Sequence, residues 1–357
     1  MHYRSREVEQ VPRKLAYDCD VLVIGGGIVG LSTACAITRS APGTRVTVLE
    51  NGPDPARHRT GPGSGVIHSG IHHRPGSLTA RYTVRGAAEM LKFCAEYDIA
   101  HAVTGKLIVA TERTELPRLH ALVQRGRENG VPVRELGTAQ ITEYEPQVRG
   151  LAAIHVATTG ICDVAALARQ LAEVSGAEIR YGTRAVRAVR LPGRGVAVLT
   201  GTGEEVRGRV LVDCAGPDHD ETAGGESYEL ARPELVRGLV HPVPEGASPS
   251  LKVRLTRRID GGVHIGARAE PGRPLSRAAF TAAVRRLLPA VTEDDLIPAA
   301  AGAQAGPGDG TPADDLLIHQ GERTVHVRNA PSPAATAALP IGREAARRAL
   351  AALTADG

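Results

Sequence analysis

The stretch that decides the fold is DVLVIGGGIVGLSTACAITRSAPGTRVTVLE, residues 20–50. It predicts a strand, a glycine turn, a helix and a second strand, at 21–24, 25–30, up to about residue 40 and 46–49. The spacing Gly-x-Gly-x-x-Gly lets the backbone approach a pyrophosphate at the start of a helix, where N–H groups and the helix dipole favour phosphate. Glu50 ends the second strand, where its carboxylate can accept hydrogen bonds from a ribose. The stretch therefore predicts a dinucleotide site that includes Gly25, Gly27, Ile28, Gly30, Glu50 and Asn51.

The composition limits the classes of partner. The 357 residues are 42% hydrophobic and 23% charged, as in folded globular proteins, and can form one large or two interleaved domains. The net charge of +4 comes from scattered arginines without a basic, aromatic-rich run, so we expect no nucleic-acid partner. The 5 cysteines are widely spaced and contain no C-x-x-C pair. That pattern argues against a disulfide framework and a structural zinc site, and we expect no metal.

The sequence contains no targeting signal that we recognise. Residues 1–17 are charged and lack the apolar run of a signal peptide. No window approaches 18 apolar residues, the length that a membrane span requires. We therefore expect a cytoplasmic protein without integral membrane contact.

The order of the other elements predicts a discontinuous dinucleotide-binding domain. A buried apolar strand at 210–216 ends in Ala-Gly, and a strand at 324–328 precedes a closing helix at 333–353. Nicotinamide dehydrogenases usually keep this domain contiguous, whereas flavoproteins often do not, so the order favours FAD. Further helices are predicted at 78–97, 115–129 and 163–175, and further strands at 106–111, 178–181, 185–190, 196–200, 205–209, 251–255 and 263–266.

We predict an α/β fold in which an antiparallel β-sheet substrate domain is inserted into a discontinuous, Rossmann-like FAD-binding domain. The expected FAD-binding domain comprises residues 19–80, 150–225 and 314–357. The expected substrate domain comprises residues 81–149 and 226–313. Residues 1–18 are expected to form a flexible leader.

Several segments carry a family resemblance. GSGVIHSGIHHRPGSLTA (63–80), GKLIVAT (105–111), TTGICD (158–163) and HVRNAPSPAATAALPIG (326–342) resemble the L-2-hydroxyglutarate dehydrogenase/oxidase family. That family belongs to the FAD-dependent oxidoreductases with the D-amino-acid oxidase fold. The similarity is almost continuous over 19–216 and resumes at 314–345.

The resemblance implies where FAD binds. The glycine turn would hold the pyrophosphate, and Ala185 would meet the adenine through its backbone. Ser64, Gly65 and Val66 would run along the flavin ring. A helix N-terminus near the pyrimidine end of the flavin would stabilise the negative charge of the reduced ring. The remaining cofactor contacts that the resemblance implies are Ala215, Gly216, Pro331, Ser332, Ala334 and Ala335.

The implied reaction is oxidation of an alcohol beside a carboxylate, in which a base removes the hydroxyl proton and FAD accepts a hydride at N5. His68 is the first candidate base and His72 the second, because a neutral imidazole suits that role. His68 could equally hydrogen-bond only the flavin or the backbone. His72 and His73 stand where the family usually has two tyrosines. Lys106 could bind an anionic substrate or be a solvated lysine at a strand end.

The substrate side departs from the family. An arginine that would hold the substrate carboxylate is replaced by Gly302, and nothing else matches the bidentate geometry of arginine. Arg254 could compensate, because LKVRLT places Val253 and Leu255 on one face and Arg254 on the other, although a solvated arginine is the simpler interpretation. Other family segments are also missing around 62–63, 231–241 and 267–271.

We therefore predict an FAD-dependent enzyme that oxidises the CH–OH group of a small molecule other than 2-hydroxyglutarate. A biosynthetic intermediate, presented by a carrier or pathway partner, would fit. Two alternatives stay open at this point. One is oxidation of a C–N bond in an amino acid or amine. The other is a degenerate protein that binds FAD without catalysis.

Overall fold

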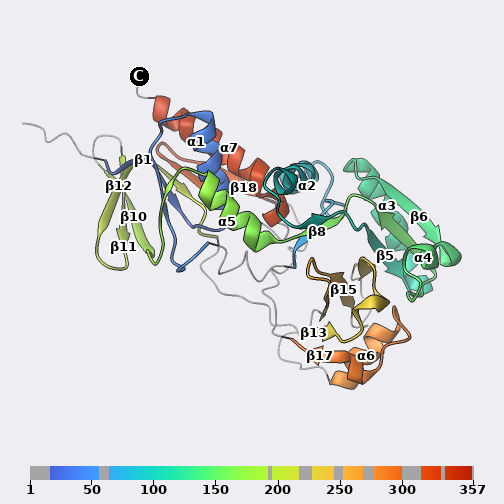
Figure 1. Cartoon of the computed structure of the whole chain (residues 1–357). Coiled ribbons are helices and arrows are strands. Elements are labelled where there is room, and N and C mark those ends of the chain that lie inside the picture. Colours follow the sequence, from blue (N-terminus) through green and yellow to red (C-terminus); the bar gives the residue numbers. More distant parts are fainter. Residues whose placement is uncertain are drawn as a thin grey trace, which may run out of the picture.

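The computed structural model describes residues 17–55, 64–191, 195–216, 227–244, 252–267, 276–299, 315–330 and 334–355. Within them the chain forms two eight-stranded sheets and one three-stranded sheet. In Figure 1 one group of strands lies to the left of helices α1 (Ile28–Ser40) and α7 (Ala334–Thr354), and a second group lies to the right of them and below. The predicted mixed α/β architecture is confirmed.

The first sheet contains the stretch that decides the fold. Its parallel strands are β9 (Glu178–Arg180), β2 (Val46–Leu49), β1 (Cys19–Ile24), β12 (Glu205–Asp213) and β19 (Thr324–Arg328). The hairpin of β10 (Ala185–Leu191) and β11 (Gly195–Thr200) pairs antiparallel with β12, and β18 (Leu317–Gln320) pairs with β19. The strands predicted at 205–209 and 210–216 are one continuous strand, because the apolar run of β12 extends its antiparallel start.

Helices α1 (Ile28–Ser40), α5 (Val164–Val174), α2 (Leu78–Glu96) and α7 (Ala334–Thr354) pack against this sheet and one another. Their apolar side chains form one core with the strands, including Val23, Leu31, Val212 and Ile341. Helices α1 and α7 cross closely at Gly342, where an added Cβ would lie 2.6 Å from the carbonyl carbon of Ser32. The helix that follows the glycine turn is therefore held by the C-terminal helix of the chain.

The second sheet has the order β17-β13-β16-β15-β14-β5-β7-β6. Only the pair of β14 and β5 is parallel among its described strands. The strands are β5 (Lys106–Ala110), β6 (Val133–Gly137), β7 (Ala152–Val156), β13 (Ser227–Leu230), β14 (Leu239–Pro242), β15 (Val253–Arg257), β16 (Val263–Ala267) and β17 (Leu296–Pro298). Shorter elements complete this part, namely α3 (Leu116–Glu128), α4 (Thr138–Tyr144), α6 (Arg277–Arg285) and the 3-10 turns Arg113–Glu115, Pro233–Leu235 and Glu293–Asp295.

One face of the second sheet packs on α6. Leu107, Val240 and Leu255 point to this side and share a core with Phe280 of α6. Because side chains alternate along a strand, Lys106, His241 and Arg254 belong to the opposite face. The alternation predicted for Val253, Arg254 and Leu255 is confirmed.

A three-stranded sheet joins the two large sheets. It consists of β3 (Val66–Ile67), β8 (Gly160–Cys162) and β4 (His101–Ala102). Val66 and Ile161 pack against Leu239, which lies on the same face of the second sheet as His241. The segment around Val66 therefore meets the polar face of the second sheet.

The boundaries between the two large sheets differ from the domain boundaries that we expected. Strand β7 pairs with β5 and β6, although residues 150–225 were assigned to the FAD-binding domain. Helix α2 packs on α7, although most of it was assigned to the substrate domain. Asp18, assigned to the leader, bonds through its backbone and carboxylate to Arg207, while residues 1–16 lie outside the described part. We propose that the domain boundaries follow the sheets. None of the helices in the described residues combines the length and apolar character of a membrane span.

Candidate active site

The glycine turn lies at the carboxyl end of β1. Gly25 has φ +97°, and an added Cβ there would lie 2.7 Å from the carbonyl oxygen of Cys214. An added Cβ at Gly30 would lie 1.9 Å from the carbonyl oxygen of Gly25. Only glycine fits at either position. Gly27 is the N-cap of α1, and no side chain of the described residues caps this helix. The helix start is therefore shaped for an anion.

Glu50 lies beside this turn. Its side chain is buried, and its two carboxylate oxygens accept hydrogen bonds from the backbone N–H groups of Gly26 and Gly52, both at 2.6 Å. Asn51 is exposed between them. The backbone N–H of Thr183, two residues before Ala185, donates to the Glu50 carbonyl at 2.8 Å. The expected ribose and adenine contacts are thus neighbours in space.

The end of β12 borders the same turn. The backbone N–H of Cys214 donates to the Ile24 carbonyl at 2.8 Å, and the backbone N–H of Ala215 donates to the Asp213 carboxylate at 3.1 Å. Gly216 follows with φ +79°. Ala215 therefore lies next to Gly25, and Gly216 follows it in the chain.

The segment around Val66 is tied to the start of α7. The backbone N–H of His68 donates to Thr336 Oγ1 at 3.1 Å, and the Gly65 carbonyl accepts from the backbone N–H of Cys162 at 2.8 Å. Exposed Ser64 precedes them, and its Oγ accepts from the Val66 N–H at 3.4 Å. The expected residues Ala334 and Ala335 begin α7. Pro331 and Ser332, like Gly302, lie outside the described residues.

Lys106 is the central cation of the second sheet. Its side chain is only 2% exposed, which overturns the alternative of a solvated lysine. Its Nζ lies 3.3 Å from Nε2 of His72, the second candidate base. Burial, followed by the positive charge of Arg254, lowers the pKa of Lys106 to about 7. The ammonium group can therefore lose its proton near neutral pH.

The neighbouring imidazoles are neutral at pH 7. Burial, followed by the charge of Lys106, lowers the pKa of His68 to about 3 and the pKa of His72 well below its usual value. The same two causes lower the pKa of His73 to about 4, while Asp315 acts in the opposite direction. His68 and His72 each keep part of their surface accessible. Neutral imidazoles with accessible surface can accept a proton or a hydrogen bond.

His241 is a member of this group that our reading of the sequence missed. Burial lowers its pKa well below the usual value, and the positive charges of Lys106 and Arg254 contribute next. Arg254 is exposed on β15, and its charge also lowers the pKa of His68. The only sequence signal for His241 was the alternation of LVHP, which places Leu239 and His241 on one face of a strand. That signal is useful only when it is known which face meets the cofactor segment.

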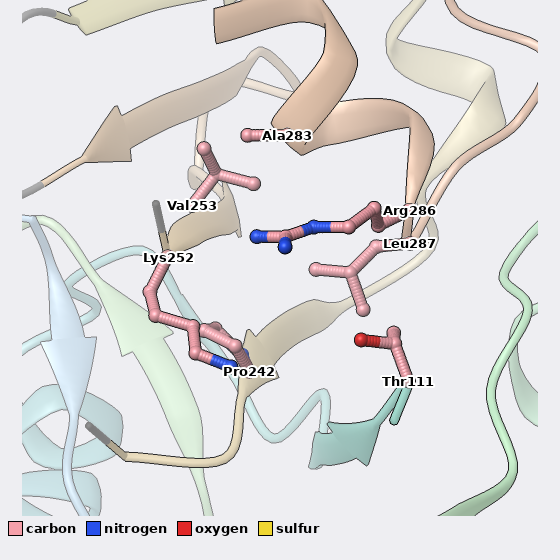
Figure 2. Close-up of a pocket in the computed structure, with 7 residues that line it drawn as sticks. All are labelled: Thr111, Pro242, Lys252, Val253, Ala283, Arg286 and Leu287. Atoms are coloured by element: carbon pink, nitrogen blue, oxygen red, sulfur yellow. The ribbon is translucent and has the colours of Figure 1, made fainter. Parts of the chain in front are cut away.

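Two hollows lie elsewhere on the second sheet. One of about 220 Å³ separates the ends of β5 and β14 from α6. Figure 2 shows Arg286 extending from the end of α6 toward Lys252 and Val253 across this hollow. Lys252 is ion-paired with buried Glu115. The other hollow, of about 400 Å³, is lined by Gly105, Lys106, Glu145, His155 and Arg237, among others. Neither is lined by the glycine turn or by His68.

Comparison with known proteins identifies the family. The family model described as FAD dependent oxidoreductase matches residues 20–348. The chain belongs to this family. The D-amino-acid oxidase fold that we inferred from the sequence is confirmed, and FAD is the cofactor.

The sequence relatives confirm the narrower resemblance. An L-2-hydroxyglutarate dehydrogenase of Indibacter alkaliphilus is 34% identical over 91% of this chain and 97% of the relative. The human mitochondrial L-2-hydroxyglutarate dehydrogenase is 34% identical over 90% of this chain and 86% of its own length.

Solved structures share the fold. L-alpha-glycerophosphate oxidase from Mycoplasma pneumoniae, with FAD bound, has a TM-score of 0.78 at 23% identity, covering 93% of this chain and 94% of that one. Glycine oxidase from Geobacillus kaustophilus has a TM-score of 0.76 at 18% identity, covering 93% and 95%. At these identities the likeness concerns the fold alone.

The geometry of this chain fits the family cofactor. The clearance at Gly25 and Gly30 and the side-chain-free start of α1 suit a pyrophosphate. Buried Glu50 stands at the end of β2, where a ribose would lie. The segment 64–68 and the start of α7 would hold the flavin. We propose that these three parts of the chain, which are far apart in sequence, form one FAD site.

Proposed function

We propose that this protein oxidises the CH–OH group of a 2-hydroxy acid or a related secondary alcohol. The observation that supports it most directly is the buried contact between Lys106 and His72, on the sheet face that meets the segment 66–68. A cation and a neutral imidazole side by side suit a substrate that carries an anion and a hydroxyl proton. The relatives are named as dehydrogenases of L-2-hydroxyglutarate, which has both groups.

The proton of the substrate hydroxyl passes to the pair formed by His72 and Lys106. The His72 Nε2 lies 3.3 Å from the Lys106 Nζ, and in this pair the imidazole is the proton acceptor and the lysine is the cation. We assign the base role to His72 rather than His68 because the His72 side chain contacts Lys106. His68 is then a neutral hydrogen-bond partner whose backbone is held by Thr336.

When bound, FAD would supply the two-electron oxidation by taking up the hydrogen of the alcohol carbon as a hydride. The substrate thus loses one proton and one hydride, and its alcohol carbon becomes a carbonyl carbon. The protein orients the substrate, excludes water and holds the proton. Lys106 stabilises the negative charge that develops on the substrate oxygen as the proton leaves.

We further propose that the preferred substrate is not L-2-hydroxyglutarate. The arginine of the family pattern is replaced by Gly302. Two described cations near the candidate bases, Lys106 and Arg254, come from the second sheet instead. An anion held from this side would lie differently, which favours a molecule of another size or charge.

Anaerobic reduction of the bound flavin tests the proposal. The FAD-loaded protein is mixed with a panel of 2-hydroxy acids, secondary alcohols, amino acids and amines, and flavin absorbance is followed. We expect rapid bleaching by a member of the first two classes. Bleaching by amines alone would overturn CH–OH oxidation. Rapid bleaching by L-2-hydroxyglutarate would overturn the altered specificity. Photoreduction without reduction by any member of the panel would support a non-catalytic FAD-binding protein.

A further inference from the structure

His241 has a buried polar atom that the fold does not satisfy. Its Nε2 is buried and has no hydrogen-bond partner among the described residues. Burying a polar group without a partner costs about 1–3 kcal/mol, and such groups in native proteins usually have a specific reason. His241 lies near the end of β14, and the other residues of this strand are apolar.

Strand register places His241 next to two cations. His241 is the partner of Ile108 in the parallel pair of β14 and β5, so it shares a face with Lys106, two residues earlier on β5. In the antiparallel pair of β14 and β15, Leu239 faces Thr256 and Val240 faces Leu255. The same register carried one residue further sets His241 opposite Arg254. The three side chains therefore come from three adjacent strands and project to one side.

This side meets the cofactor segment. Leu239, on the same face as His241, packs against Val66 and Ile161. Val66 is followed by His68, and His72 reaches Lys106. The charges act on each other across this space, since Lys106 and Arg254 both lower the pKa of His68 and of His241. His241 thus lies near the two candidate bases, which also contribute to the lowering of its pKa.

The chemistry of the group selects an anion. Lys106 has only donor hydrogens, and among the described residues it forms no ion pair. Arginine and lysine beside a neutral imidazole match a carboxylate, which accepts several hydrogen bonds at once. A neutral imidazole whose Nε2 carries the hydrogen can donate a hydrogen bond to a carboxylate oxygen without becoming charged itself.

We propose that His241 and Arg254, together with Lys106, form the subsite that binds a carboxylate of the substrate, with His241 Nε2 as a hydrogen-bond donor. This inference rests on the proposed function and identifies the residues that take the place of the missing family arginine. His241 and Arg254 are then specificity-determining residues, held by the second sheet rather than by the FAD-binding part.

Binding of a carboxylate that cannot be oxidised tests the subsite without turnover. The FAD-loaded protein is titrated with glutarate and, separately, with its neutral analogue glutaramide, and the change in the flavin spectrum gives each Kd. We expect glutarate to bind at least about tenfold more tightly than glutaramide, as the loss of one charged hydrogen bond, about 1.5–3 kcal/mol, implies. His241→Phe and Arg254→Met should each remove this preference, with the flavin content unchanged.

Two further variants control the result. His241→Gln keeps an N–H donor and should retain glutarate binding within a few-fold, which separates hydrogen bonding from packing. His155→Phe makes the same exchange on the opposite face of the same sheet, where His155 stacks on Tyr144, and should leave binding unchanged. Equal binding of glutarate and glutaramide by the unaltered protein would overturn the inference. So would unchanged glutarate binding in His241→Phe. The titration requires no reducing substrate, so failure of the proposed reaction and failure of the subsite can be told apart.

Discussion

The turn at the start of α1 and the polar face of the second sheet are built in contrasting ways. The turn is formed by backbone atoms. A Cβ at Gly25 or Gly30 would overlap a backbone carbonyl oxygen, so both positions require glycine, and the start of α1 offers backbone N–H groups. The polar face is made of side chains, in which Lys106, His241 and Arg254 project from three strands. The first recognises a cofactor common to a whole family. The second can change its ligand by exchanging a few side chains.

The contrast has an energetic side as well. The atoms packed against Gly25 and Gly30 are backbone atoms, which cannot rotate away as a side chain can. A single added methyl group must therefore displace the chain. The polar face contains one buried lysine and several imidazoles, and burial and neighbouring charges lower the pKa values of these groups. Changes there should alter binding and pH dependence while the fold and the FAD content persist. Four experiments test this difference.

The largest effect is expected from Gly30→Ala. The new Cβ would lie 1.9 Å from the Gly25 carbonyl oxygen, and relieving this overlap costs about 1–3 kcal/mol or more. The turn must open, so the purified variant should contain little or no FAD, measured as the ratio of flavin to protein absorbance. Gly201→Ala is the control, since its Cβ would meet no atom closer than 3.7 Å. Full FAD content in Gly30→Ala would contradict the role of the turn.

Lys106→Met should lose activity but keep its FAD content, whereas Gly30→Ala should lose FAD. Loss of the ammonium beside His72 removes a charged interaction of about 2–3 kcal/mol, or roughly 10²-fold in kcat/KM, while FAD content is unchanged. Steady-state kinetics with the substrate found in the anaerobic panel, together with flavin absorbance, measure both quantities. Lys92→Met, an exposed position on α2, is the matched control. Equal activity of the two variants would remove Lys106 from the site.

The pH dependence of glutarate binding should report Lys106. Its pKa is about 7 in the free protein because of burial and then Arg254, and a bound anion must raise it. The Kd should therefore be constant below pH 7, where Lys106 is already protonated, and rise by about tenfold per pH unit above it.

The other titratable groups facing Lys106 do not produce this slope. His68, His72 and His73 from the segment after β3, and His241 from β14, have lowered pKa values and stay neutral above pH 6. Arg254 from β15 stays charged. Lys106→Met should abolish the slope, and a slope that persists in this variant would assign the titration to another group.

The smallest effect is expected from Asp315→Asn, which lies outside both regions. The Asp315 carboxylate accepts the backbone N–H groups of Leu78 and Thr79 at the start of α2, both at 2.9 Å. Burial raises its pKa, but the hydrogen bonds from Thr79 and its neighbours outweigh this and the net pKa is lowered. At pH 7 the free energy of unfolding of the variant should be lower by about 1–2 kcal/mol, which corresponds to a few degrees in Tm.

The sign of this effect with pH is fixed by the lowered pKa. The stabilisation is complete above the ordinary pKa of the carboxyl and disappears as the pH falls through the lower folded value, so the two proteins should converge in acid. Asp294→Asn, at an exposed position, should leave Tm unchanged at every pH. Kinetic constants should stay the same in both variants, because neither residue belongs to the turn or the polar face.

The parts of the fold with a strong local pattern were predicted well. The strands at 46–49 and 324–328 match the structure residue for residue, and α1, α2 and α5 end within a residue or two of the expected positions. Their apolar periodicity and their flanking glycines act within a few residues, so they can be recognised locally. The short strands β3, β7 and β8 were missed, because each depends on partners distant in sequence.

The candidate site divides along the same line. Gly25, Gly27, Gly30 and Glu50 could be proposed from their spacing alone, since the chemistry of a phosphate-binding turn is contained in one short stretch. Lys106 was found only with a solvated lysine as an equal alternative, and His241 was not found at all. Burial, strand register and the neighbouring charges make them a group, and all three arise from pairing between distant strands.

The glycine stretch at 20–50 thus specified a dinucleotide site without help from the rest of the chain, because steric limits on the backbone act locally. The resemblance of further segments narrowed the dinucleotide to FAD. Which side chains face the cofactor segment was decided only in the folded molecule. A strand exposes alternate residues to opposite faces, and only the packing of the second sheet on α6 and α3 decides which side chains are left to face the cofactor segment.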